Sequence, residues 1–199
     1  MNINRPRLLA GSLAIAIVVI GAFVVTQVGG DDGPAPDAVL DDSQDRTPPP
    51  LDGSIPRNND LAGEPLPDVV VLDAACAEVS TQSFVGQPLV INFWFSTCIP
   101  CERELPDFAE VHAEVGDEVR FIGMNTTDSV PVMERFAAER GVEYELFQDS
   151  FAEFQEAAGI AAFPQTLFVT SDGQIVDQVG VIDADGLREK IANLQEMDT

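Results

Sequence analysis

The longest run of apolar positions lies near the start of the chain. Residues 8–28 carry no charged side chain. As a helix rising about 1.5 Å per residue they would extend about 31 Å, which matches the hydrocarbon core of a bilayer. Arg5 and Arg7 precede the run whereas Asp31 and Asp32 follow it. This charge asymmetry predicts a single-pass transmembrane helix with residues 1–7 in the cytoplasm and the rest of the chain exported.

A cleaved signal peptide is the alternative for this run. Signal peptides have an apolar region of about 7 to 15 residues and a small-residue cleavage site after it. The run here is longer, and neither an Ala-x-Ala pattern nor a cysteine for lipid attachment follows it closely. We therefore favour an uncleaved signal anchor in the cell membrane.

The next stretch lacks any sustained apolar period. Residues 29–65 are rich in Asp, Pro and Gly, with three consecutive prolines at 48–50. Such a composition cannot bury enough apolar surface to fold, and both proline and charge extend the chain. We predict a disordered linker over 29–65 that holds the following domain, residues 66–199, away from the membrane.

Hydrophobic periodicity over 66–199 alternates between strand and helix. The apolar run LVINFW at 89–94 predicts a buried strand, and a helical period then runs from near Cys98 to Gly116, with a kink expected at Pro106. Further strands are predicted at 69–72, 77–81, 119–124, 144–147, 165–170 and 174–179. Further helices are predicted at 131–141, at 151–158 with Ser150 as cap, and at 184–195. The order predicts an α/β fold with a central mixed β-sheet flanked by helices.

The charge of the chain excludes one class of partner. Its formal net charge is -24 at pH 7, and no cluster of Lys and Arg with interleaved aromatic residues occurs. Repulsion from phosphates would oppose binding, so we expect no nucleic-acid partner. We interpret the acidic residues as a solubilising surface in preference to an adaptation to high salt.

Two of the three cysteines form a Cys-x-x-Cys pair, Cys98 and Cys101, directly after the predicted buried strand. At a helix N-terminus, free N–H groups and the helix dipole stabilise a thiolate, which predicts Cys98 as the nucleophile. Cys101 follows one turn later, where it can close a disulfide with Cys98 or resolve a mixed disulfide on it. Pro100 stiffens this first turn without removing a hydrogen bond that the turn needs.

Zinc binding and a purely structural disulfide are the alternatives for this pair. A zinc site needs further ligands, and only Cys76 and His112 remain, neither in a matching spacing. A structural disulfide gains little by closing so short a loop. We therefore predict redox chemistry that uses no metal and no cofactor.

The segments VINFWFSTCIPCERELP, AAFPQTLFV and SDGQIV resemble the thioredoxin superfamily, specifically its membrane-anchored ResA/TlpA-type branch. The resemblance covers residues 66–194 and implies a thioredoxin-like three-layer fold. It also implies that Pro164 is a cis-proline facing the cysteine pair, and that the Phe163 backbone hydrogen-bonds an extended substrate segment. A cis bond is chemically eligible before proline, and a plain turn proline is the alternative.

Two positions differ from ordinary thioredoxin. Asn92 stands where thioredoxin has a buried aspartate, and Thr97 stands where it has a tryptophan. ResA-type proteins resemble the chain at Asn92 and have a glutamate three residues after the second cysteine, which is Glu104 here. Partial burial one turn below that cysteine would raise the pKa of Glu104 and let it exchange protons with the thiols. The alternative is a solvated glutamate paired with a neighbouring arginine, Arg103 or Arg120.

Three other side chains are assigned mainly structural roles. Trp94 is expected to pack beneath the cysteine pair and to shield it. Cys76 is expected to be a passive buried thiol, with a regulatory or partner-linked cysteine as the alternative. His112 is expected on the helix surface or in the core, because it lies about three turns beyond the pair.

The expected activity is that of an extracytoplasmic thiol–disulfide oxidoreductase acting on protein disulfides. Glu102 and Glu104 oppose a very stable Cys98 thiolate and Arg103 offsets only part of this, which favours a reductant. The resemblance implies the same direction. It implies a membrane electron donor of the CcdA/DsbD kind and apocytochrome c as a substrate during cytochrome c maturation.

Three other functions stay open. The first is an oxidising or general disulfide-exchange protein. The second is a peroxidase of the peroxiredoxin type, which has a single peroxidatic cysteine where this chain has a pair. The third is a copper-binding chaperone resembling the Sco family, which needs a wider Cys-x-x-x-Cys spacing and a later histidine, whereas no histidine follows His112.

Overall fold

The computed structural model describes residues 57–198. The predicted membrane anchor at 8–28 and most of the predicted linker lie outside these residues. Along the described part, no helix has both the length and the apolar character required to cross a bilayer.

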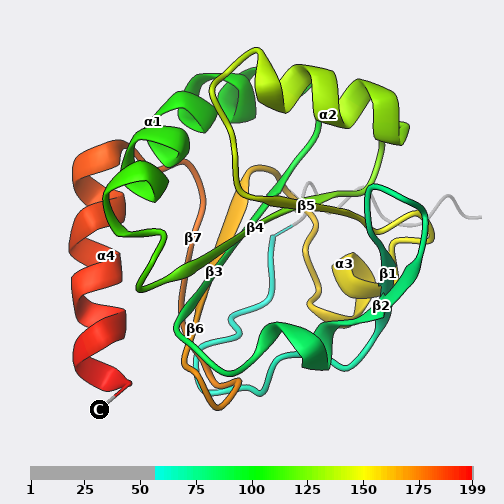
Figure 1. Ribbon diagram of the computed structural model, residues 1–199. Coiled ribbons are helices and arrows are strands. Elements are labelled where there is room, and N and C mark those ends of the chain that lie inside the picture. The colour runs from blue at the N-terminus through cyan, green and yellow to red at the C-terminus, as the bar shows by residue number, and fades with distance from the viewer. Residues whose placement is uncertain (1–56, 199) are drawn as a thin grey trace, which may run out of the picture. The chain divides into compact units, whose positions relative to one another are not determined.

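One mixed sheet lies at the centre of the described residues (Figure 1). Its strands are β1 (Val70–Leu72), β2 (Glu78–Ser80), β3 (Leu89–Trp94), β4 (Arg120–Asn125), β5 (Glu145–Gln148), β6 (Gln165–Val169) and β7 (Ile175–Val179). They are ordered β2-β1-β5-β4-β3-β6-β7. The β3–β4 and β4–β5 pairs are parallel and the other pairs are antiparallel, so the prediction of a mixed sheet is confirmed.

Helices connect the strands and cover the sheet. They are α1 (Ile99–Val115), α2 (Val130–Ala138), α3 (Glu153–Ala157), α4 (Ala184–Met197) and the short 3-10 helix η1 (Thr81–Phe84), which was not predicted. Helix α1 continues through Pro106 and ends before Gly116. The α1 boundaries therefore agree with those expected from its apolar period.

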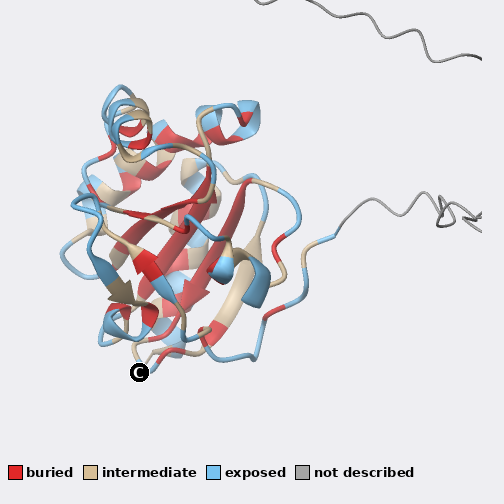
Figure 2. Cartoon of the chain, turned by 90° about the vertical axis from the view of Figure 1, so that its right-hand side faces the viewer, coloured by how far each residue is buried: buried red, intermediate tan, exposed pale blue. Residues whose placement is uncertain are grey.

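Two hydrophobic clusters lie on opposite faces of the sheet, because side chains alternate along a buried strand. Phe108 of α1, Met133 of α2 and Leu187 of α4 pack on one face. Phe84 of η1 and Phe154 of α3 pack on the other. Figure 2 shows buried residues concentrated on the central strands. Helices thus cover both faces, as predicted, and the architecture is the three-layer one expected.

Helix α3 begins later than predicted, and Ser150 does not cap it. Its N-cap residue is Ala152, which has a φ of 56° and makes no side-chain cap. The buried Asp149 carboxylate instead accepts hydrogen bonds from the N–H groups of Phe154 at 3.2 Å and Gln155 at 2.8 Å. The prediction of a Ser150 cap was wrong because the carboxylate of Asp149, the residue before it, already accepts hydrogen bonds from the free N–H groups at the start of α3.

The folded part of the chain begins earlier than the predicted linker boundary at 65. Leu61 is buried, and the backbone of residues 63–66 hydrogen-bonds residues 173–175 at the start of β7. This pairing covers part of an open sheet edge, which would otherwise present unpaired backbone groups. Because the partners lie more than 100 residues apart in the sequence, local composition gave no sign of the contact.

Cys76 is exposed, contrary to the prediction of a buried thiol. It lies in the turn between β1 and β2 with a φ of 60°. The Asp73 carboxylate holds this turn by accepting hydrogen bonds from the N–H groups of Ala75 and Ala77, both at 2.8 Å. A hairpin tip of this kind lies at the surface and has no core against which a thiol can pack.

Candidate active site

A disulfide joins Cys98 and Cys101 at the start of α1, close to the carboxyl end of the central strand β3. The sulfur atoms are 2.00 Å apart and the Cα atoms 5.2 Å apart. Cys98 is the N-cap residue of α1, and its Sγ accepts a hydrogen bond from the Cys101 N–H at 3.3 Å. The helix N-terminus therefore directs a donor at the Cys98 sulfur, an arrangement that stabilises a thiolate.

The two cysteines differ in accessibility. Cys98 is 6% exposed, whereas Cys101 is 0% exposed. Ile99 and Pro100, which lie between them in the first turn of α1, are exposed. Cys98 is thus the more exposed residue of the pair in the disulfide form.

The carboxylates near the start of α1 carry less free charge than the sequence suggested. Glu102 forms an ion pair with Arg140, with 2.6 Å between Oε1 and Nη2. Glu104 is buried, and its pKa is raised to about 7. Because one charge is paired and the other is partly protonated near neutral pH, the expected repulsion of a Cys98 thiolate is weaker than predicted.

Glu104 lies one turn after Cys101 and is 2% exposed. The Nδ2 of Asn92, on β3, donates hydrogen bonds to Glu104 Oε1 at 2.8 Å and to Thr166 Oγ1 at 3.1 Å. The Ile182 N–H donates to Glu104 Oε2 at 3.4 Å. Burial raises the pKa of Glu104 to about 7, although the hydrogen bonds from Asn92 and Ile182 lower it. A carboxyl group with this pKa exchanges protons readily near neutral pH.

The Phe163–Pro164 peptide bond is cis, as the resemblance implies. Pro164 is buried and directly precedes β6, in which Gln165 pairs with Phe93 of β3. This antiparallel register places the cis-proline beside the carboxyl end of β3, where the cysteine loop begins. The Phe163 ring packs edge-on against Phe95, with ring centroids 5.2 Å apart.

Asp128 holds the loop before Cys98 and was not recognised in the sequence. Its carboxylate accepts hydrogen bonds from the Ser96 N–H at 2.7 Å and the Ser96 hydroxyl at 2.5 Å. Asn125, the last residue of β4, donates to the same carboxylate at 2.8 Å. The position of Asp128 just after β4 could have indicated this contact. Strands β3 and β4 are parallel neighbours, and the carboxyl ends of such strands meet at one edge of the sheet.

Trp94 is fully buried in the same hydrophobic cluster as Cys98 and Cys101. Its ring stacks on Phe136 of α2, with ring centroids 5.7 Å apart. Trp94 is therefore a core residue on the same face of the sheet as the cysteine pair, as predicted.

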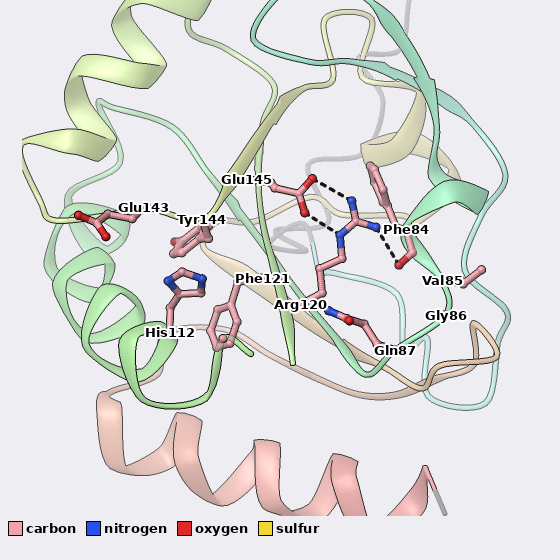
Figure 3. Close-up of a pocket in the computed structure, with 11 residues that line it drawn as sticks. Phe84, Val85, Gly86, Gln87, His112, Arg120, Phe121, Glu143, Tyr144 and Glu145 are labelled. Carbon is pink, nitrogen blue, oxygen red and sulfur yellow. Dashed lines mark hydrogen bonds and ion pairs between the residues drawn. The ribbon is translucent and has the colours of Figure 1, made fainter. Parts of the chain in front are cut away.

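A cavity of about 410 Å³ lies at the other end of α1 (Figure 3). His112 lines it and packs edge-on against Phe121 and Tyr144, at centroid distances of 5.3 and 5.4 Å. Arg120 also lines it, but its guanidinium binds Glu145 with an N–O distance of 2.7 Å. His112 is thus a packing residue, as predicted, and Arg120 is not a partner of Glu104. No group of three His, Cys, Asp or Glu side chains within residues 57–198 is arranged to hold a metal ion.

Comparison with known proteins identifies relatives of this chain. The profile of the AhpC/TSA family matches residues 62–178. The thiol-disulfide oxidoreductase ResA of Halalkalibacterium halodurans is 28% identical over 116 residues, which cover 58% of this chain and 66% of the relative. ResA of Bacillus anthracis is 23% identical over 118 residues, which cover 59% and 68%. The matches thus span about two thirds of these relatives' own length.

Solved structures with the same fold include disulfide oxidoreductases. The structure of dsbF of MTB, in mixed oxidised and reduced forms, has a TM-score of 0.59 and 26% identity and covers 64% of this chain and 95% of that one. A putative thiol:disulfide interchange protein DsbE from Chlorobium tepidum has a TM-score of 0.60 and 20% identity, and the match covers 69% of this chain and 99% of that one. At this identity the likeness supports the fold alone. Because the family profile matches more than half of its length, the chain belongs to the AhpC/TSA family, within the thioredoxin superfamily.

Proposed function

We propose that the protein is an extracytoplasmic thiol–disulfide oxidoreductase in which Cys98 attacks and Cys101 resolves. The difference in access between the two cysteines carries this proposal, because only Cys98 contacts solvent in the disulfide form. The thiol-disulfide oxidoreductases among its relatives support the reaction class.

In the reducing direction the reaction consists of two exchanges. The Cys98 thiolate attacks a substrate disulfide, a mixed disulfide forms, and the other substrate sulfur leaves as a thiolate that takes up a proton. The Cys101 thiolate then attacks Cys98 Sγ, the bond between Cys98 and the substrate breaks, and the second substrate sulfur leaves as a thiolate that takes up a proton. Two electrons thus pass to the substrate, and the two protons that it takes up balance those lost when the Cys98 and Cys101 thiols form thiolates.

Glu104 accepts the proton of Cys101 in this scheme. Its carboxyl lies one helical turn from Cys101, and burial raises its pKa to about 7, so it can take up and release a proton near neutral pH. Proton transfer to Glu104 converts the buried Cys101 into the thiolate that the second exchange needs. Asn92 and the Ile182 N–H orient the carboxyl for this role.

The substrate segment docks beside the cis-proline. The N–H and carbonyl groups of Phe163 form no hydrogen bond with the rest of the described residues, so they are free to pair with an extended chain. Ile99 and Val181 are 62% and 67% exposed. The neighbours of Val181 in the sequence place it near the site, because Gly180 lies near the Pro164 carbonyl and the Ile182 N–H binds Glu104. These apolar side chains offer contact area around the disulfide.

The finer role that we propose is reduction of protein disulfides such as those of apocytochrome c during cytochrome c maturation. A membrane protein of the CcdA/DsbD kind would re-reduce Cys98–Cys101, and the predicted anchor at 8–28 would hold the domain at the outer face of the cell membrane. The resemblance to ResA-type proteins and the ResA relatives support this assignment.

Trapping with Cys101→Ser tests the proposed function. Without the resolving thiol, the Cys98 mixed disulfide with a substrate persists and can be isolated. Because the exposed free thiol of Cys76 can form adducts of its own, the variant is made in a Cys76→Ser background, with Cys98→Ser in the same background as control. Adducts that need Cys98 support thiol–disulfide exchange, and recovery of apocytochrome c supports the finer role. Equal adducts in the control would contradict both.

An oxidising or general exchange protein is the second candidate. The Glu102–Arg140 ion pair and the raised pKa of Glu104 favour it, since both weaken the repulsion of a Cys98 thiolate. The reduction potential of the Cys98–Cys101 disulfide distinguishes a reductant from an oxidant. A reductant should have a potential near that of thioredoxin, about −270 mV, whereas an oxidant should have one near that of DsbA, about −120 mV.

A further inference from the structure

Residues 58–61, which we term the strap, connect the outer edge of the sheet to the cis-proline loop. The Leu61 N–H donates to Gln178 Oε1 of β7 at 3.0 Å, and Gln178 Nε2 donates to the Asn59 carbonyl. The Asn59 N–H donates to the Gly159 carbonyl at 3.1 Å, at the end of the α3 segment. The strap is thus fastened on one side to β7 and on the other to the chain that leads into the cis-proline loop.

Asn58 binds the cis-proline loop through both ends of its side-chain amide. Its Oδ1 accepts hydrogen bonds from the N–H groups of Ala161 at 2.8 Å and Ala162 at 2.7 Å. Its Nδ2 donates to the Ala162 carbonyl at 3.2 Å and to the Gln165 side-chain carbonyl. One side chain therefore satisfies three backbone groups immediately before Phe163.

These contacts matter because packing does not order the two residues before Phe163. Ala161 and Ala162 are exposed, and their methyl groups cannot fix a loop by packing. Hydrogen bonds from Asn58 replace the regular pairing that begins only at Gln165 in β6. The division of partners is also informative: Asn58 binds the backbone of Ala161 and Ala162 and leaves that of Phe163 unpaired.

We propose that Asn58 is a positioning residue for substrate, which holds the Ala161–Ala162 backbone so that the Phe163 N–H and carbonyl face an incoming extended segment. This inference rests on the proposed function. Because Asn58 lies within the residues predicted as linker, 29–65, the strap joins the substrate-binding loop to the chain that leads back to the predicted anchor.

Amide hydrogen exchange of the full chain tests the contact itself. In Asn58→Ala the Ala161 and Ala162 amides lose their acceptor, so their exchange should accelerate at least about tenfold. Asn59→Ala is the matched control, because the Asn59 side chain makes no hydrogen bond with described residues while its backbone bonds persist. Unchanged exchange at both alanines in Asn58→Ala would overturn the proposal.

Kinetics with a short disulfide-bonded peptide test the consequence. A positioning role predicts that Asn58→Ala raises KM about tenfold and changes kcat much less, since orientation of the bound segment is lost and the sulfur chemistry is kept. Asn58→Asp keeps the acceptor for both N–H groups and should recover part of the affinity. The rate with dithiothreitol, which has no extended segment, should fall far less than kcat/KM for the peptide.

Other outcomes separate this inference from the proposed function. An equal fall with peptide and dithiothreitol would indicate general damage to the active site and would overturn the positioning role. A wild-type KM in Asn58→Ala would overturn it as well. A wild-type protein that exchanges with dithiothreitol but with no peptide disulfide would overturn the proposed function and this inference together.

Discussion

Buried polar side chains are concentrated next to the disulfide. Asn92, Glu104 and Thr166 are all nearly inaccessible, and the Asn92 amide donates hydrogen bonds to the other two side chains. Asn92 Oδ1 and Trp94 Nε1 have no partner among the described residues. Burying polar groups costs free energy, and groups with perturbed pKa values occur preferentially at functional sites. This cluster is therefore the place where single substitutions should alter proton chemistry.

Replacement of Glu104 should change how stability depends on pH. In the oxidised protein burial raises the pKa of Glu104 from 4.5 to about 7, so between these values the unfolded chain loses the proton while the folded chain keeps it. The stability that this proton gives is present below pH 4.5 and is lost as the pH rises to 7. Glu104→Gln should not show this loss. Relative to wild type, its free energy of unfolding should increase by about 3 kcal/mol between pH 4.5 and pH 7.

Denaturant unfolding at several pH values measures this difference. Glu189→Gln, an exposed glutamate of α4, is the matched control and should follow the wild-type pH dependence. If Glu104→Gln followed it too, Glu104 would not have the raised pKa on which its proton-transfer role depends.

Asn92 should tune the same carboxyl. Its Nδ2 hydrogen bond favours the charged form of Glu104, so Asn92→Ala should raise the pKa of Glu104 above about 7. Carbon NMR of the carboxyl group during a pH titration measures the change. Asn193→Ala, on the exposed face of α4, should leave the titration unchanged. A lower pKa in Asn92→Ala would contradict the role assigned to the hydrogen bond.

At the scale of elements, the sequence predicted those helices and strands whose bounds depend on neighbouring residues in the chain. The strand at 89–94 was predicted from continuous apolar residues, and β3 has those bounds because it is buried on both faces. The start of α1 followed from the Cys-x-x-Cys pair and Pro100. The Asp128 contact with Ser96 and the strap were missed, because each joins residues that are far apart in the sequence. The Asp149 cap is local and was missed because the helix was predicted to begin two residues too early.

The helix α3 offers a direct comparison between the predicted and the observed cap. Asp149→Ala removes the acceptor for the Phe154 and Gln155 N–H groups and should reduce the free energy of unfolding by about 1–2 kcal/mol. Ser150→Ala should have almost no effect, because the exposed Ser150 makes no cap. Chemical denaturation of both variants measures the two values. A larger decrease in the free energy of unfolding from Ser150→Ala than from Asp149→Ala would indicate that Ser150 caps the helix, as predicted from the sequence.

At the scale of the whole molecule, negative charge dominates. The chain has a formal net charge of -24, and Arg188 of α4 pairs with two carboxylates of α1, those of Glu110 and Glu114. Self-repulsion of this size opposes the compact state and is screened by salt.

Added salt should therefore stabilise the protein. The thermal midpoint should rise when sodium chloride is increased from low concentration to about 0.15 M, where the screening length falls to about 8 Å. Potassium chloride at the same ionic strength should give the same rise, because the effect is screening. A lower midpoint would mean that ion pairs such as Arg188–Glu114 outweigh the repulsion.

The central claim is that an accessible Cys98 reacts and a shielded Cys101 resolves. Brief alkylation of the reduced full chain at neutral pH, followed by mass-spectrometric mapping, tests it most directly, with the exposed Cys76 as an internal reference. We predict that Cys98 is modified well before Cys101. Modification of Cys101 as fast as Cys98 would contradict the assignment.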